Sequence, residues 1–312
     1  IADDVFERAL LPHFLDSADN KRKALVSGFI WMRYHLKGWE WCDDLDKSGW
    51  TPEQKGQFLA YLPFTKETWD RASEWLQDHE SQYWTRTGAN AYQADGDLAI
   101  AIEKLIEHGR PHAAINCLDR MRHAKQPIDS NQCVRALLAA LSFSEPSYAM
   151  DGYHIVELIK FLQADPTVNQ DDLFRVEWAY VPLLDRHRGA APRLLESRLA
   201  NDPEFFCEVI RLIYRSKKED QPSRELTEES KAIATNAWRL LHEWKTPPGT
   251  QQDGKFSEER FTEWLQRVKE VCTESGHLEV ALNNIGEVLI HTPSDPDGLW
   301  IRRAVAAALN DR

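Results

Sequence analysis

The first segment whose residue types could do chemistry is a short acidic stretch near the N-terminus. Asp44, Asp46 and Ser48 alternate along the chain and Gly49 follows them, as in the first half of an EF-hand calcium loop. Position twelve of such a loop is Lys55 here, so the bidentate glutamate that completes a calcium site is missing. We interpret the stretch as a polar turn between helices, with weak calcium binding by Asp44, Asp46 and Ser48 as the alternative.

Two histidines have the spacing of metal ligands on one helix face. His108 and His112 are four residues apart, but Gly109 and Pro111 place a helix break between them. We expect no metal there, and we interpret His108 as a helix C-terminal residue whose imidazolium complements the helix dipole.

The chain contains no phosphate-binding glycine loop, no dinucleotide fingerprint and no nucleophile elbow. We therefore expect no cofactor and no catalytic activity. An enzyme whose active site is assembled from distant histidines and carboxylates is the alternative, because such a site leaves no local motif.

A basic strip covers residues 108–125, where Arg110, Arg120, Arg122 and three histidines face a single acidic residue, Asp119. Such a strip could bind an acidic peptide or a phosphate group, and a nucleic-acid-binding helical domain that uses it is an alternative function. The other interpretation is a solvated helix face whose charges meet acids on the neighbouring helix.

The N-terminal part is unusually rich in tryptophan, since seven of the twelve lie in the first 84 residues. Trp39 and Trp41 are predicted to border an irregular segment that reaches Trp50, with Tyr34 just before it. Large amphipathic side chains in such a position could line a recognition groove. Packing into the core is the alternative, because aromatic side chains dominate interiors as well as interfaces.

The elements that must position these residues are helices, because apolar residues recur with helical spacing and no run of period-two alternation occurs. The predicted helices span residues 3–16, 21–36, 52–61, 66–79, 97–108, 112–122, 130–142, 151–163, 170–187, 192–200, 203–216, 228–244, 258–274, 277–291 and 297–309.

Four helix starts have clear capping signals. Thr51, Asp202, Thr227 and Ser257 each place a side-chain oxygen before a proline or an acidic first turn. Within the helix predicted over 170–187, Pro182 should kink or split the helix, because it removes a backbone donor and clashes with the preceding turn.

Short joints make successive helices antiparallel, and hairpins that cannot bury their apolar faces alone stack into arrays. The sequence therefore predicts an all-α fold of stacked antiparallel helical hairpins, resembling an α-solenoid of degenerate tetratricopeptide or HEAT-like repeats. We expect a Trp-rich unit over 1–92, a central array over 93–245 and a C-terminal unit over 255–312. Residues 246–254 would form a linker or long loop.

Composition narrows the function classes. The 312 residues are 42% hydrophobic and 28% charged, with a net charge of −12, which disfavours nucleic acid as a partner. Five scattered cysteines and the lack of a long apolar run favour a reduced, cytoplasmic protein without a membrane segment. The chain begins with Ile1 rather than Met, so we expect a piece of a longer protein.

The last third resembles the C-terminal α-helical region of large bacterial multidomain proteins that carry a predicted ATPase of the signal-transducing (STAND) class further upstream. The resemblance rests on residues 202–206, Asp253-Gly254, residues 285–287 and residues 293–300. It implies ligand sensing or scaffolding, and it assigns no functional residue. We therefore expect a non-catalytic helical interaction module that binds a protein or peptide.

Overall fold

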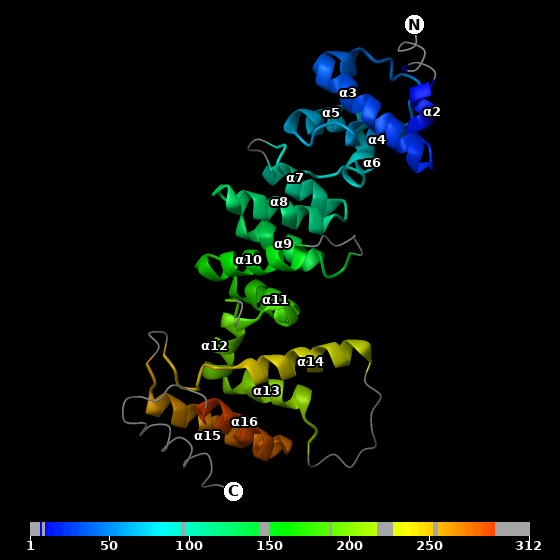
Figure 1. Ribbon diagram of the computed structural model, residues 1–312. Coiled ribbons are helices and arrows are strands. Elements are labelled where there is room, and N and C mark those ends of the chain that lie inside the picture. The colour runs from blue at the N-terminus through cyan, green and yellow to red at the C-terminus, as the bar shows by residue number, and fades with distance from the viewer. Residues whose placement is uncertain are drawn as a thin grey trace. The chain divides into compact units, whose positions relative to one another are not determined.

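The computed structural model describes Glu7 and residues 10–94, 98–143, 150–186, 189–216, 227–251 and 255–290 (Figure 1). These residues are mostly α-helical, and the β pairing among them is limited to an isolated bridge between Thr250 and Phe256. The all-α prediction is confirmed. None of the described helices combines the length and the apolar character that a membrane crossing requires.

The chain divides into two compact units, Ile1–Asp165 (unit 1) and Pro166–Arg312 (unit 2). The division predicted from the sequence places its boundaries elsewhere, at 92–93 and at 246–254, and stays a prediction. Unit 1 contains the helices α2 (Leu11–Leu15), α3 (Asn20–Asp44), α4 (Pro52–Ala60), α5 (Lys66–Leu76), η2 (Gln77–His79), α6 (Ser81–Trp84), α7 (Leu98–Glu107), α8 (Pro111–His123), α9 (Ser130–Ala139) and α10 (Asp151–Ala164). Unit 2 contains α11 (Gln170–Tyr180), η3 (Val181–Leu183), α12 (Arg193–Asn201), α13 (Pro203–Ile213), α14 (Glu228–Glu243), α15 (Glu258–Ser275) and α16 (Leu278–Ile290).

Helix starts follow the local capping chemistry that the sequence predicts. Thr51 forms a complete capping box with Gln54. The side chains of Asp202, Thr227 and Ser257 each accept a hydrogen bond from the backbone N–H three residues further on. All four predicted starts are confirmed.

The break in α3 lies at Gly38, whose backbone has φ +63° and ψ −154°. Glycine adopts this region readily because it has no Cβ. The helical pattern resumes after it, so Trp39 and Trp41 lie in the last turns of α3. The helix predicted over 21–36 is therefore longer in the structure and reaches Asp44, because a single glycine absorbs the change of direction.

Pro182 splits the helix predicted over 170–187, as expected. Regular α-helix ends at Tyr180, and the 3₁₀ turn Val181–Leu183 follows. Two further predictions, the helix over 297–309 and the resemblance over 293–300, lie outside the described residues.

Packing follows the order of the chain within each unit. In unit 1, α8 packs against α7, α9 and α10, and α4 packs against α5 and α6. In unit 2, α13 contacts α12, α14 and α15, and α15 contacts α16. The two cores are rich in large aromatic side chains. Trp69 and Trp84 are buried in unit 1, and Phe206, Trp244 and Trp264 are buried in unit 2.

Candidate functional site

The aromatic residues predicted to line a groove divide between core and surface. Trp41 and Trp50 are only 6% and 9% exposed, and both rings pack against Phe58. Tyr34 and Trp39 are half-buried and form an edge-to-face pair with ring centroids 5.3 Å apart. Trp41 and Trp50 therefore belong to the core of unit 1, because their surface is taken up by packing.

Trp39 is held against α5 by polar contacts. Its indole N–H donates to Glu67 Oε2 at 2.9 Å, and the guanidinium carbon of Arg71 lies 3.9 Å from its ring centroid. Arg71 is held in turn by two hydrogen bonds to the Asp43 carboxylate. This contact lowers the pKa of Asp43. The contacts fasten the end of α3 to α5.

The 44–55 loop is organised around an internal cation. The ammonium group of Lys47 donates to the carbonyl oxygens of Cys42, Asp43 and Leu45 at 2.6–3.2 Å, which satisfies the free carbonyls at the end of α3. Asp46 accepts hydrogen bonds from the N–H and hydroxyl of Ser48. These hydrogen bonds form a turn that caps the C-terminal end of α3. Among the described residues, no three His, Cys, Asp or Glu side chains gather closely enough to hold a metal ion.

The arginines of the 108–125 strip contact other parts of unit 1. Arg110 donates to the carbonyl oxygens of Trp84 and Thr87 at 3.3 and 3.1 Å. Arg122 bonds to Asp119 on its own helix and to Glu157 on α10. Arg120 lies over an aromatic ring, with its guanidinium carbon 4.9 Å from the centroid of Tyr92. Arg110 and Arg122 therefore fasten elements of unit 1 together.

The histidines near the strip face carboxylates between α8 and α10. His112 Nδ1 lies 3.0 Å from Asp151 Oδ2, and His154 Nε2 lies 3.5 Å from Asp119 Oδ2. Both carboxylate side chains are more than nine-tenths buried. This seam joins the two helices, as expected for charges that meet acids on a neighbouring helix.

Three hollows in the described part of unit 2 share lining residues. The largest, about 820 Å³, is lined by α12, α15 and the loop before α15. A second hollow of about 390 Å³ shares Asn201 and Arg260 with it, and a third of about 370 Å³ shares Arg193 and Thr246. We call the largest hollow the arginine groove; its lining residues are Arg193, Ser197, Asn201, Thr246, Thr250, Gln251 and Arg260.

One face of α12 forms a wall of the arginine groove, because Arg193, Ser197 and Asn201 recur every four residues along it. The start of α12 is fixed by Glu177, a fully buried side chain of α11. Its carboxylate oxygens accept hydrogen bonds from the N–H groups of Leu194 and Leu195. This anchors the helix end that carries Arg193.

The loop before α15 is docked rather than free. Gly249, with φ +84°, donates its N–H to Ala200 O at 3.3 Å and accepts from Ser257 N–H at 3.0 Å. A Cβ at this position would lie 2.9 Å from the backbone nitrogen of Phe261, so only glycine fits without a shift. The tight contact places Thr246, Thr250 and Gln251 along the groove.

The charge of the groove is positive. Arg193 and Arg260 are exposed, and neither forms an ion pair with another described residue. Arg186, beside the groove, bonds instead to the buried carboxylate of Glu196. Burial raises the pKa of Glu196, and the Arg186 guanidinium opposes that shift. Two guanidinium groups therefore remain for an external anion.

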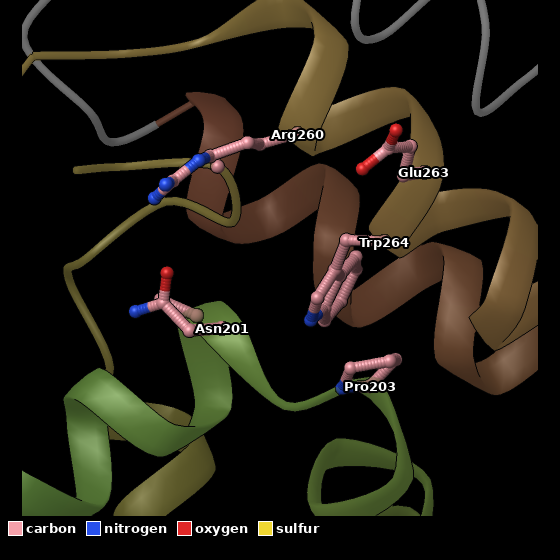
Figure 2. A pocket seen from close by; sticks show the side chains of 7 residues that line it. Asn201, Pro203, Arg260, Glu263 and Trp264 are labelled. Atoms are coloured by element: carbon pink, nitrogen blue, oxygen red, sulfur yellow. The ribbon is translucent and has the colours of Figure 1, made fainter.

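Trp264 forms part of the wall of the adjoining hollow. Its side chain is 5% exposed, and its indole N–H has no hydrogen-bond acceptor among the described residues. Figure 2 shows the nitrogen end of the ring turned toward Asn201 and Pro203, with the Arg260 side chain across the hollow. The wall thus combines a rigid aromatic side with a polar rim.

Sequence reasoning missed the arginine groove. Its arginines lie 67 residues apart in the chain, and no motif joins them. The four-residue spacing of Arg193, Ser197 and Asn201 was a signal that α12 has a polar face. Only the docking of the 246–251 loop shows that this face borders a cavity.

Comparison with known proteins adds no family to this description. No protein-family model matches the chain, and neither does any curated protein or solved structure.

Proposed function

We propose that this chain is a non-catalytic α-helical interaction module whose arginine groove binds an acidic segment of a partner protein. The carrying observation is that Arg193 and Arg260 converge on one open hollow without an intramolecular ion pair to another described residue. In a chain with a net charge of −12, such a site is a local exception, and it favours an anionic partner.

The proposal includes an architecture of stacked antiparallel helical hairpins of the degenerate tetratricopeptide or HEAT type. It is supported by the packing of each helix on its near neighbours in the chain, as in the set α7 to α10. An array of this kind offers long surfaces to peptides. It would suit the sensor or partner-binding part of a larger cytoplasmic bacterial protein.

A non-catalytic role is supported by the state of the nucleophilic side chains. All five cysteines are buried, and burial raises the pKa of Cys42 and of Cys117 to about 12. The thiolate, not the thiol, is the nucleophile, so Cys42 and Cys117 are poorly poised to react at neutral pH.

A peptide partner is favoured over nucleic acid by the use of the basic residues. Arg110 and Arg122 hold unit 1 together, so the 108–125 strip offers few guanidinium groups to phosphates. The arginine groove is short and also presents hydroxyl and amide side chains, which can bond the backbone of an extended peptide.

Binding of fluorescein-labelled hexaglutamate, followed by anisotropy at low ionic strength, tests the proposal with the full chain. The double variant Arg193→Gln/Arg260→Gln should weaken binding about tenfold or more, because two charge-assisted contacts are lost. The matched control is Arg175→Gln, an exposed arginine of unit 2 that pairs with Asp172. Equal affinity of the double variant and the wild type, with unchanged circular dichroism, would contradict the proposal.

A further inference from the structure

A second exposed surface lies in unit 1, on the first part of α3. Leu36, Leu25, Met32 and Trp31 are 68%, 57%, 56% and 44% exposed, although all four are large apolar side chains. Single exposed apolar residues are ordinary, but a row of them on one helix marks an interaction site. This row is distant in sequence from the arginine groove, so an inference about it does not rest on the proposed function of the groove.

The row has the spacing of a helix-packing seam. Leu25, Phe29, Met32 and Leu36 follow each other at intervals of four, three and four residues, as the apolar positions of a coiled coil do. We call these four residues the α3 stripe. Phe29 is half-buried and packs edge-on against Trp41, with centroids 6.2 Å apart. The stripe is therefore anchored to the core of unit 1 at its middle and exposed on both sides of that point.

All charged residues of this part of α3 are basic, and two of them, Arg22 and Arg33, pair with Asp19 and Glu7. From Asn20 to Trp39 the chain contains five lysines and arginines and no aspartate or glutamate, in a protein whose net charge is −12. Lys21, Lys23 and Lys37 are exposed and form no ion pair with another described residue. An apolar seam flanked by unpaired cations is complementary to an apolar seam flanked by carboxylates.

We propose that the α3 stripe binds an amphipathic helix of a partner protein that carries acidic residues beside its apolar seam. The apolar side chains of that helix would cover Leu25, Met32 and Leu36, and its carboxylates would face Lys21 and Lys37. A second copy of this chain would place one acid-free, basic stripe against another, and like charges would oppose it. An anionic membrane would attract the stripe, but it would repel the acidic remainder of the chain.

The test uses two synthetic 21-residue helical peptides and the full chain. The acidic probe has leucine at the seam positions and glutamate at the flanking positions, and the basic probe has lysine in place of glutamate. We expect the acidic probe to bind and the basic probe not to bind. Met32→Ser/Leu36→Ser should weaken binding of the acidic probe about tenfold or more. The matched control Ile100→Ser, which removes a 50% exposed apolar residue of α7, should leave it unchanged.

Several outcomes would overturn the inference. Equal affinity for both probes would show that charge does not select the partner, and no binding of the acidic probe would remove the site. A dimer in sedimentation experiments that Met32→Ser/Leu36→Ser dissociates would assign the stripe to self-association. Sedimentation with phosphatidylserine vesicles, lost in the same variant and without acidic-probe binding, would assign it to a lipid surface.

Discussion

The 108–125 strip of unit 1 and the arginine groove of unit 2 hold similar side chains and use them in opposite ways. In the strip, Arg122 meets Asp119 and Glu157, and Arg110 meets backbone carbonyls. In the groove, Arg193 and Arg260 face an open hollow. The density of basic residues along a sequence therefore does not reveal a binding site. What matters is whether the fold supplies partners to those residues.

The largest expected effect is on the stability of unit 1. Asp119→Ala removes the buried carboxylate that faces Arg122, His123 and His154, so of its two carboxylate partners Arg122 keeps only Glu157. We expect a loss of about 3 kcal/mol in the free energy of unfolding, because breaking a buried ion pair from one side is strongly destabilising. Urea unfolding followed by circular dichroism measures it. A loss below about 1 kcal/mol would show that the seam is loosely solvated.

Substitution of the groove arginines should lower the affinity for an acidic peptide and leave the free energy of unfolding nearly unchanged. For Arg193→Gln/Arg260→Gln we expect the tenfold loss of hexaglutamate affinity stated above and a change in unfolding free energy within about 0.5 kcal/mol, as is usual for exposed positions. Parallel urea titrations of the variant and the wild type check this. A large loss of stability would mean that these arginines have structural partners. The groove would then not differ from the strip in how its arginines are used.

The loss of stability in Arg110→Gln should lie between that of Asp119→Ala and that of the groove variant. Its guanidinium group bonds the carbonyl oxygens of Trp84 and Thr87, so the shorter amide leaves these acceptors without a donor. We expect a loss of about 1 kcal/mol in unfolding free energy. Affinity for hexaglutamate should not change. If Arg110→Gln weakened peptide binding as strongly as the groove variant does, the strip would be part of the binding surface.

The smallest expected effect is a pH dependence at the edge of the groove. Burial raises the pKa of Glu196 in the folded chain, with the Arg186 guanidinium opposing the shift, so folding favours the protonated form. Its contribution to stability is therefore present at low pH and is lost as the pH rises from its ordinary pKa through the raised one. The unfolding free energy of Glu196→Gln relative to the wild type should increase between pH 4 and pH 8. A relative decrease over that range would show that the Arg186 bond dominates.

The sequence predicted the features of this fold that depend on neighbouring residues. Capping at Thr51 and Ser257 and the split at Pro182 involve hydrogen bonds and clashes within one helical turn, so the residue types decide them. The resumption of α3 after Gly38 was not predicted, because the packing of Trp41 against Phe58 favours a helical end that local propensity does not indicate.

The candidate sites required the tertiary structure. Arg193 and Arg260 line one hollow together with the loop that Gly249 docks on Ala200, a contact that no spacing in the sequence signals. The aromatic residues show the same limit, since Trp39 and Trp41 are two residues apart and yet only Trp41 is buried in the core. The apolar pattern of α3 could be read from the sequence, but its exposure could not.

Amide hydrogen exchange on the full chain, with and without hexaglutamate, tests the central claim most directly because it compares both regions in one sample. If the arginine groove binds acidic segments, added peptide should slow exchange in residues 193–201 and 246–251 and leave residues 108–125 unchanged. Slowed exchange in residues 108–125, with none in the groove, would contradict the account and return the binding site to the basic strip.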